Sequence, residues 1–176
     1  MALSTLYQLR QALPEECPAI GQLMVQVYSA LAGFPQPDEQ PAYYQKLANI
    51  GELAEQPGVD LLAAVDAEGN IGGAVLYFHD ITQYGAQGVA DNEEDAGGFR
   101  LLAVDPATRG QGLGKKLTNA CLDLAKETGK KQVVIHSTKA MQVAWGMYEK
   151  LGFVRAEDLD FEQEGFPVFG FRLVFD

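Results

Sequence analysis

Cysteine, long apolar runs and, in the first half, basic residues are all scarce in this 176-residue sequence. The two cysteines, Cys17 and Cys121, are far apart, and each lies in an apolar helical pattern. This favours free buried thiols in a reducing compartment over a disulfide or a metal site. No apolar run approaches the roughly 20 residues that cross a bilayer, and residues 1–5 do not resemble a secretory signal. We therefore expect a cytoplasmic protein without a metal or a membrane partner.

The charges are unevenly distributed along the chain. The net charge is −11, and residues 1–99 hold fourteen acidic residues against Arg10 and Lys46 alone. Residues 109–139, in contrast, hold seven basic and two acidic residues. This basic segment predicts an anionic ligand there and permits a cationic one elsewhere, although a merely solvated surface would also explain it. The strong net negative charge makes nucleic acid a poor candidate.

The order of helical and strand patterns predicts one α/β (α+β) domain over residues 1–176, built on a single mixed sheet. No repeat or linker divides the sequence, and residues 79–98 form an expected long loop with four glycines. Helical patterns are expected at 15–31, 42–55, 113–129 and 141–151, and strand patterns at 5–10, 61–65, 71–78, 99–104, 132–136, 153–155 and 168–174.

A glycine-rich segment, residues 109–114, lies between the strand ending at Val104 and the following helix. The first turn of a helix has backbone N–H groups without intrahelical partners, and glycines let a phosphate approach them closely. A Walker A loop is excluded, because Lys116 replaces Ser or Thr and Arg109 replaces the first glycine. The dinucleotide fingerprint fails as well, since Lys115 takes the place of its third glycine. A pyrophosphate is the expected occupant, and a plain helix start is the alternative.

These residues resemble the GCN5-related N-acetyltransferase (GNAT) family. One family signature matches residues 101–114, from Leu-Leu-Ala-Val-Asp-Pro to Arg-Gly-Gln-Gly-Leu-Gly, and a second matches residues 144–153. The resemblance implies a mostly antiparallel sheet of about seven strands and about four helices, splayed between the Val104 and Val134 strands. It also implies that acetyl-CoA is the cosubstrate. The residues that it places around the pantetheine arm and the pyrophosphate are Leu102, Ala103, Val104, Arg109, Gly110, Gln111, Gly112, Leu113, Gly114 and Lys115.

The resemblance implies further that Tyr148 is the general acid, because a phenol with a pKa of about 10 can protonate a departing thiolate. A core aromatic is the alternative role of Tyr148. Relatives often carry a glutamate as base where this sequence has Gly98. The nearest substitutes are Glu94 and Asp95, followed by His79 and His136, with ordered water as the other route. Charge alone suggests Lys139 or Lys116 for the 3′-phosphate.

The expected function is transfer of an acetyl group from acetyl-CoA to a primary amine of a small molecule or peptide by direct attack. The acidic first half suggests a cationic acceptor, and the loops 34–44 and 79–98 are expected to select it. An acyl-CoA-binding regulatory or interaction module without turnover is the alternative, and an interaction domain that kept only the fold is a third. A homodimer is common among relatives.

Overall fold

The structure, a computed structural model, describes residues 6–176 and builds them around an eight-stranded sheet. Seven strands follow the order β1-β2-β3-β4-β5-β8-β6, and β7 pairs with β8 off this path. Of the strand pairs in the described residues, β4 and β5 run parallel and the others are antiparallel. The strands are β1 (Gln8–Gln11), β2 (Val59–Val65), β3 (Ile71–Phe78), β4 (Ala96–Val104), β5 (Gln132–Ser137), β6 (Val154–Arg155), β7 (Phe161–Gln163) and β8 (Phe166–Val174).

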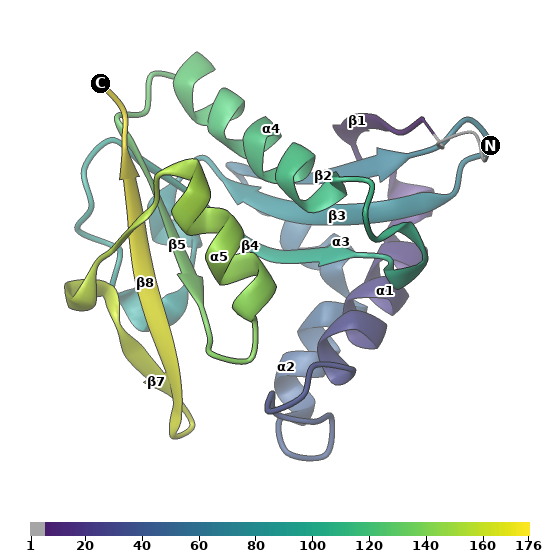
Figure 1. Cartoon of the computed structure of the whole chain (residues 1–176), viewed down its shortest axis with the longest axis horizontal. Helices are drawn as coiled ribbons and strands as arrows, with labels where there is room; N and C mark the ends of the chain where they lie inside the picture. Colours follow the sequence, from purple (N-terminus) through teal and green to yellow (C-terminus); the bar gives the residue numbers. More distant parts are fainter. Residues whose placement is uncertain (1–5) are drawn as a thin grey trace.

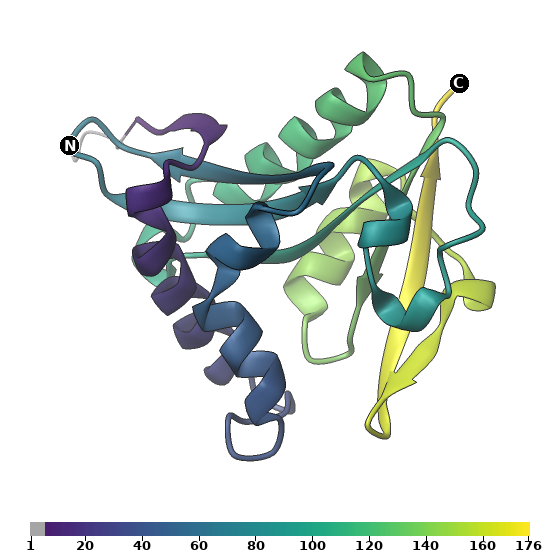
Figure 2. The same cartoon turned by 180° about the vertical axis from the view of Figure 1, so that it is seen from behind.

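Within the described residues, five α-helices cover the two faces of the sheet (Figures 1 and 2). The first three lie on one face and the last two on the other. They are α1 (Cys17–Ser29), α2 (Pro41–Ala48), α3 (Ile50–Ala54), α4 (Leu113–Glu127) and α5 (Gln142–Leu151). Among residues 6–176, no helix combines the length and the apolar character that a membrane crossing requires.

Both faces of the central strands are buried, which explains their continuous apolar runs. Along β2, Leu61 and Ala63 join the core with α1, α2 and α3, whereas Leu62 and Ala64 join the core with α4 and α5. This alternation is the period of two that a strand imposes on its side chains. The sheet therefore separates two hydrophobic cores, and a ligand that reaches both must pass where the strands part.

The predicted fold class, a single mixed and mostly antiparallel sheet, is confirmed, with four local differences. The helix expected at 42–55 is two helices, because Asn49 has a non-helical ψ of 38°. β7 was not predicted, and β4 begins at Ala96 rather than at Phe99. The strand expected at 5–10 is observed at 8–11, and Thr5 lies outside the described residues.

Candidate active site

Strands β4 and β5 separate soon after they begin, as the family resemblance implies. They pair only over residues 96–98 and 132–134, and beyond these β5 pairs with β8 alone. A bulge accompanies the separation: Leu101 and Leu102 together lie opposite Val75, and Leu101 has a φ of +60°. Because a bulge bends its strand, it carries the rest of β4 away from β5. The predicted splay between the Val104 and Val134 strands is therefore present.

The separation leaves one edge of β4 without a neighbouring strand. Leu102, Ala103 and Val104, expected along the pantetheine arm, lie in this stretch, which we call the open edge (residues 99–104). Helix α5 lies in front of the diverging strands in Figure 1. From the opposite face, Tyr28 of α1 donates a hydrogen bond of 2.9 Å to the Leu102 carbonyl. Unpaired backbone on an edge strand can hydrogen-bond an extended ligand.

The glycine loop presents a row of free backbone N–H groups at the start of α4. Gly110 and Gly112 have φ values of +86° and +73°, and Gly112 is the N-cap of α4 with no side-chain cap. Among the described residues, nothing accepts a hydrogen bond from the N–H groups of 112–115. A Cβ at either glycine would meet no atom within 4 Å, so the loop borders open space. Successive free N–H groups after a left-handed residue form an anion-binding concavity.

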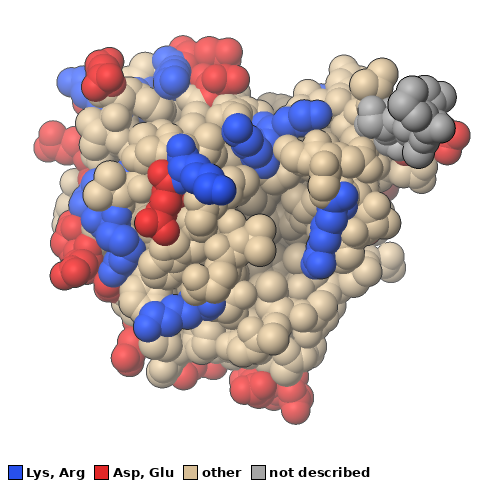
Figure 3. Space-filling model, in the orientation of Figure 1, with Lys and Arg blue, Asp and Glu red and all other residues tan. Residues whose placement is uncertain are grey.

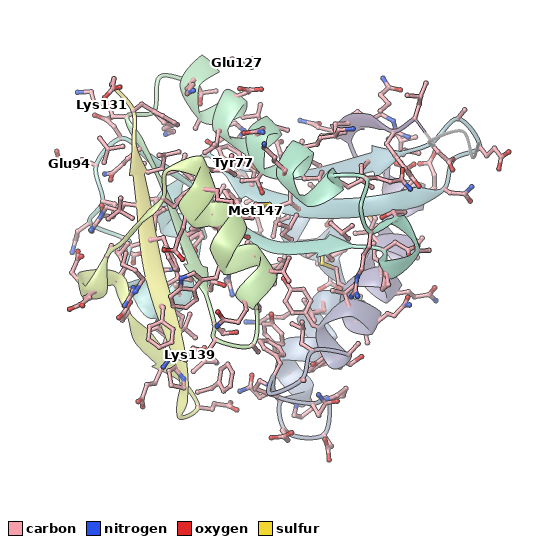
Figure 4. All side chains as sticks on the ribbon, in the orientation of Figure 1. Tyr77, Glu94, Glu127, Lys131, Lys139 and Met147 are labelled. Carbon is pink, nitrogen blue, oxygen red and sulfur yellow. The ribbon has the colours of Figure 1, made fainter. Side chains whose placement is uncertain are left out.

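The loop, the open edge and α5 converge at Gly114. A Cβ placed there would lie 3.7 Å from Val104 Cγ2 and 3.8 Å from Met147 Sδ. Figure 4 labels Met147 on α5, and Figure 3 shows a hollow near the middle of the same face, with Lys and Arg side chains on both sides of it. Most Asp and Glu side chains visible on this face lie around the outline of the molecule, away from the hollow. The hollow thus combines an anion-binding loop with a positive local potential in an acidic protein.

Tyr148 points from α5 into the core near the splay. Its ring packs between Phe99 and Phe153, with both centroids 5.8 Å away, and it is 5 % exposed. Its hydroxyl has no hydrogen-bond partner among residues 6–176, whereas the hydroxyls of Tyr28 and Tyr84 each have one. Burial raises the pKa of Tyr148 well above its usual value. The phenol therefore stays protonated at neutral pH, which suits an acid and excludes a base.

Tyr84 occupies the space that a side chain at position 98 would need. A Cβ at Gly98 would lie 2.8 Å from the Tyr84 ring, so no glutamate can take that place without displacing the ring. The Tyr84 hydroxyl lies 2.8 Å from His136 Nδ1, and His136 Nε2 lies 2.7 Å from the Leu159 carbonyl. Since a carbonyl only accepts, Nε2 carries the proton and Nδ1 accepts from Tyr84. Burial lowers the pKa of His136 to about 4, which leaves it neutral and without a free nitrogen.

The other predicted bases lie outside the splay. Glu94 and Asp95 are exposed and precede the paired part of β4, and Asp95 Oδ2 lies 3.7 Å from Lys131 Nζ. Figure 4 shows Glu94 and Lys131 at the edge of the molecule, away from Met147. His79 follows β3 and contacts Asp60 at 2.7 Å. The structure does not bring any of these groups to Tyr148.

A group of aromatic residues around Arg100 is not predicted by the patterns in the sequence. Phe34 and Tyr43 pack with Tyr28 at centroid distances of 5.6 and 6.3 Å, and Phe34 also contacts Phe166 at 5.7 Å. Next to Phe166 lies an open cavity of about 370 Å³, bordered by the connections that follow α1 and β5 and by β8. A charged residue inside the apolar run of β4 was the signal that could have revealed Arg100. We call Tyr28, Phe34, Tyr43 and Phe166 the aromatic wall. Phe34 and Tyr43 belong to residues 34–44, one of the two loops expected to select the acceptor.

Lys139, one of the two side chains suggested for a 3′-phosphate, borders that cavity, with its Nζ 5.5 Å from the centre of the Phe169 ring. Lys116 is exposed in the first turn of α4. The two lysines therefore lie on different elements, α4 and the connection after β5. A phosphate bound by one need not contact the other, so which of them binds it stays a prediction.

Comparison with known proteins agrees with this geometry. An N-acetyltransferase of Thermoplasma acidophilum, crystallised with coenzyme A, superposes with a TM-score of 0.73 at 14 % identity over 96 % of this chain and 99 % of that one. A Salmonella typhimurium protein described as a putative acetyltransferase with its cofactor acetyl-CoA gives 0.64 at 20 % identity, over 97 % and 94 %. At these identities the likeness concerns the fold.

Sequence comparison shows the family. An uncharacterized N-acetyltransferase of Escherichia coli is 28 % identical over 82 % of this chain and 80 % of its own length. N-alpha-acetyltransferase 30 of Schizosaccharomyces pombe is 38 % identical, but over only 36 % of this chain and 42 % of its own length. The chain also spans only 39 % of the mycothiol acetyltransferase of a Nocardioides species that it matches. The profile of the acetyltransferase (GNAT) family matches residues 22–153. This match covers most of the chain and agrees with the splayed strands and the free N–H groups, so the chain belongs to the acetyltransferase (GNAT) family.

Proposed function

We propose that this protein transfers an acetyl group from acetyl-CoA to a primary amine of a small molecule or peptide by direct attack. The observation that carries the proposal is the set of free N–H groups at 112–115, which borders open space beside the splay. The residues assigned to the pyrophosphate are 109–115, where Arg109 and Lys115 add full charges to the backbone dipoles. The open edge at Leu102, Ala103 and Val104 is assigned to the amide groups of the pantetheine arm.

In this arrangement the thioester lies at the splay, close to Tyr148. The amine nitrogen forms a bond to the acetyl carbon as the carbon–sulfur bond breaks, and Tyr148 gives its phenolic proton to the departing sulfur. Holding amine and thioester together supplies most of the rate, because the reaction needs little covalent help. The Tyr148 hydroxyl has no partner in the described part of the chain, which supports this role, since the proton is free to be shared with a ligand.

The amine must also lose a proton before or during attack. We propose that ordered water carries this proton to solvent, and Glu94 or Asp95 stays the carboxylate alternative. The double substitution E94Q/D95N decides between the two routes. Turnover within about twofold of the unmodified protein supports the water route, whereas a loss of tenfold or more, with acetyl-CoA affinity unchanged, supports the carboxylates.

Two matched glycine substitutions test acetyl-CoA binding. Gly112 and Gly129 stand at opposite ends of α4, both have positive φ, and neither has an atom within 4 Å of a placed Cβ. An alanine at either position costs about 1 kcal/mol of backbone strain. Only Gly112→Ala, however, puts a methyl group where the pyrophosphate is proposed to bind.

The measurement is thermal unfolding with and without acetyl-CoA, followed by thiol release with a panel of amines. At about 100 times the dissociation constant, the ligand should stabilise the unmodified protein and Gly129→Ala by about 2.7 kcal/mol each. Gly112→Ala should lose most of that gain. Equal gains in both variants would refute the loop assignment, and no gain in any protein would refute acetyl-CoA binding. Binding without thiol release for any amine would favour the non-catalytic alternative.

A further inference from the structure

Arg100 is an arginine without a carboxylate partner in the interior of the site. It lies on β4 opposite Leu76, two residues after the last pair with β5, and it is half-buried. Its Nη1 donates a hydrogen bond of 2.9 Å to the Tyr84 carbonyl, and its guanidinium lies 5.6 Å from the Tyr84 ring centre. No carboxylate of residues 6–176 lies within 4 Å of it. Most of its five N–H donors thus remain available.

The other arginines of the described residues show that a partly buried arginine without a carboxylate partner is unusual in this protein. Arg10 forms two hydrogen bonds to the carboxylate of Glu16, and Arg155 forms two to Asp160. Arg172 likewise binds Glu93 through two nitrogens and also contacts Asp158. Arg109 alone is exposed and belongs to the glycine loop. A guanidinium held away from water normally has a carboxylate as a bidentate partner, because an unpaired charge is costly to bury.

The groups that face Arg100 are neutral and come from four elements. Burial raises the pKa of Tyr28, Tyr43 and Tyr84, and the charge of Arg100 opposes each rise. Burial lowers the pKa of His136, and Arg100 lowers it further. Contacts connect these groups to the guanidinium. Arg100 donates to the Tyr84 carbonyl after β3, and the Tyr84 hydroxyl hydrogen-bonds His136 of β5. Tyr28 of α1, which packs on Tyr43 of α2, reaches the Leu102 carbonyl on β4. None of these groups supplies a negative charge at neutral pH.

Arg100 also shares neighbours with Tyr148. Phe99, which immediately precedes Arg100 in β4, packs on Tyr148 with ring centroids 5.8 Å apart. Tyr28 in addition donates to the Leu102 carbonyl on the open edge. The unpaired cation therefore lies close to the place where the amine and the thioester must meet, on the side of the sheet that carries the aromatic wall.

From this arrangement we infer that the acceptor carries a carboxylate a few bonds from its amine, as amino acids do, and that Arg100 binds that carboxylate. A planar guanidinium matches a carboxylate with two parallel hydrogen bonds, which would fix the amine relative to the splay. Phe34, Tyr43 and Phe166 offer an apolar surface to the rest of the acceptor. This inference rests on the proposed acetyl transfer and narrows its acceptor class.

The test compares phenylalanine, phenylalaninamide and phenethylamine as acceptors in the thiol-release assay, at several pH values so that amine basicity is accounted for. The unmodified protein should use the acid at least tenfold better than the amide in kcat/KM. R100Q should lower kcat/KM for the acid by about tenfold or more, leave the amide within about threefold, and keep the acetyl-CoA thermal shift. R100K, which keeps the charge without the planar fork, should retain part of the preference.

R10Q is the matched control, because it removes an arginine that is paired with Glu16 outside the site. It should leave the preference for the acid intact. Equal use of acid and amide by the unmodified protein, or an equal loss for both in R100Q, would overturn the inference. Either result leaves acetyl transfer standing, whereas an absent acetyl-CoA shift would instead remove the proposed function itself.

Discussion

A fall in pH should destabilise the protein through His136. The folded pKa of this imidazole is about 4 against 6.5 in an unfolded chain, because burial disfavours its charged form. Arg100 adds to the lowering, whereas the Leu159 carbonyl and Asp160 oppose it. Below pH 6.5 the unfolded chain binds a proton that the folded protein does not, so stability present above 6.5 is lost progressively toward pH 4. The difference corresponds to about 3 kcal/mol over the whole range, and to about 2 kcal/mol between about pH 7.5 and pH 5.

The assay is urea unfolding followed by the fluorescence of Trp145, the only tryptophan, which packs on Phe169 and Phe171. Carboxylates also titrate in acid, so His136→Gln is compared with the unmodified protein at each pH. The loss of stability on acidification should be about 2 kcal/mol smaller in His136→Gln.

If His136→Gln does not fold, nitrogen chemical shifts of the imidazole in the unmodified protein give the same answer. They should report a neutral ring protonated on Nε2 down to about pH 5. A ring that titrates near 6.5, or a His136→Gln variant with an unchanged pH dependence, would refute the buried, fully hydrogen-bonded state. Such a ring would also restore His136 as a candidate base.

Two further predictions concern catalysis and the cosubstrate. Tyr148→Phe should leave acetyl-CoA affinity nearly unchanged and reduce turnover at least tenfold, about 1.4 kcal/mol in the barrier, as measured by thiol release. The control is Tyr77→Phe, which removes a buried hydroxyl that has no partner among residues 6–176, from the strand face under α4, and should leave turnover intact. If Lys139 binds the 3′-phosphate, Lys139→Ala should bind acetyl-CoA and its 3′-dephospho analogue with equal affinity. Lys116→Ala should still bind acetyl-CoA more tightly than the analogue. The opposite result would assign the 3′-phosphate contact to Lys116 on α4.

The sequence predicts the parts of the site that depend on local signals. Glycines before an amphipathic helix identify the loop at 109–114, and the apolar run before it identifies the end of β4. Gly97 and Gly98 mislead the prediction, because glycines suggest a loop. In the fold both glycines lie near the start of β4. Glycine is required at these two positions because Tyr77 and Tyr84 occupy the space where a Cβ atom would lie.

Contacts between distant segments are what local patterns could not supply. Arg100 donates to the Tyr84 carbonyl, Tyr84 hydrogen-bonds His136, and Tyr28 reaches β4 at the Leu102 carbonyl. No spacing in the sequence links residues 28, 84, 100 and 136. The short strand β7 was also missed, although Glu164 and Gly165 both have positive φ, which is typical of a tight hairpin turn. A Glu-Gly pair is a weaker turn signal than Asn-Gly, so the hairpin depends on its pairing with β8.

Two charge effects that act over different distances explain how an acceptor can be cationic and also carry the carboxylate that Arg100 is inferred to bind. The fourteen acidic residues of positions 1–99 act through a field that salt screens over about 8 Å, and this field attracts the ammonium form of any amine. Arg100 acts only at contact, where screening by salt is weak. An amino acid is favoured by both the long-range field and the contact with Arg100, since it carries an ammonium and a carboxylate. Added salt should therefore reduce kcat/KM most for amines without a carboxylate, and the preference for the acid over phenethylamine should grow. A preference that shrinks with salt would mean that long-range attraction, and not contact with Arg100, distinguishes the two acceptors.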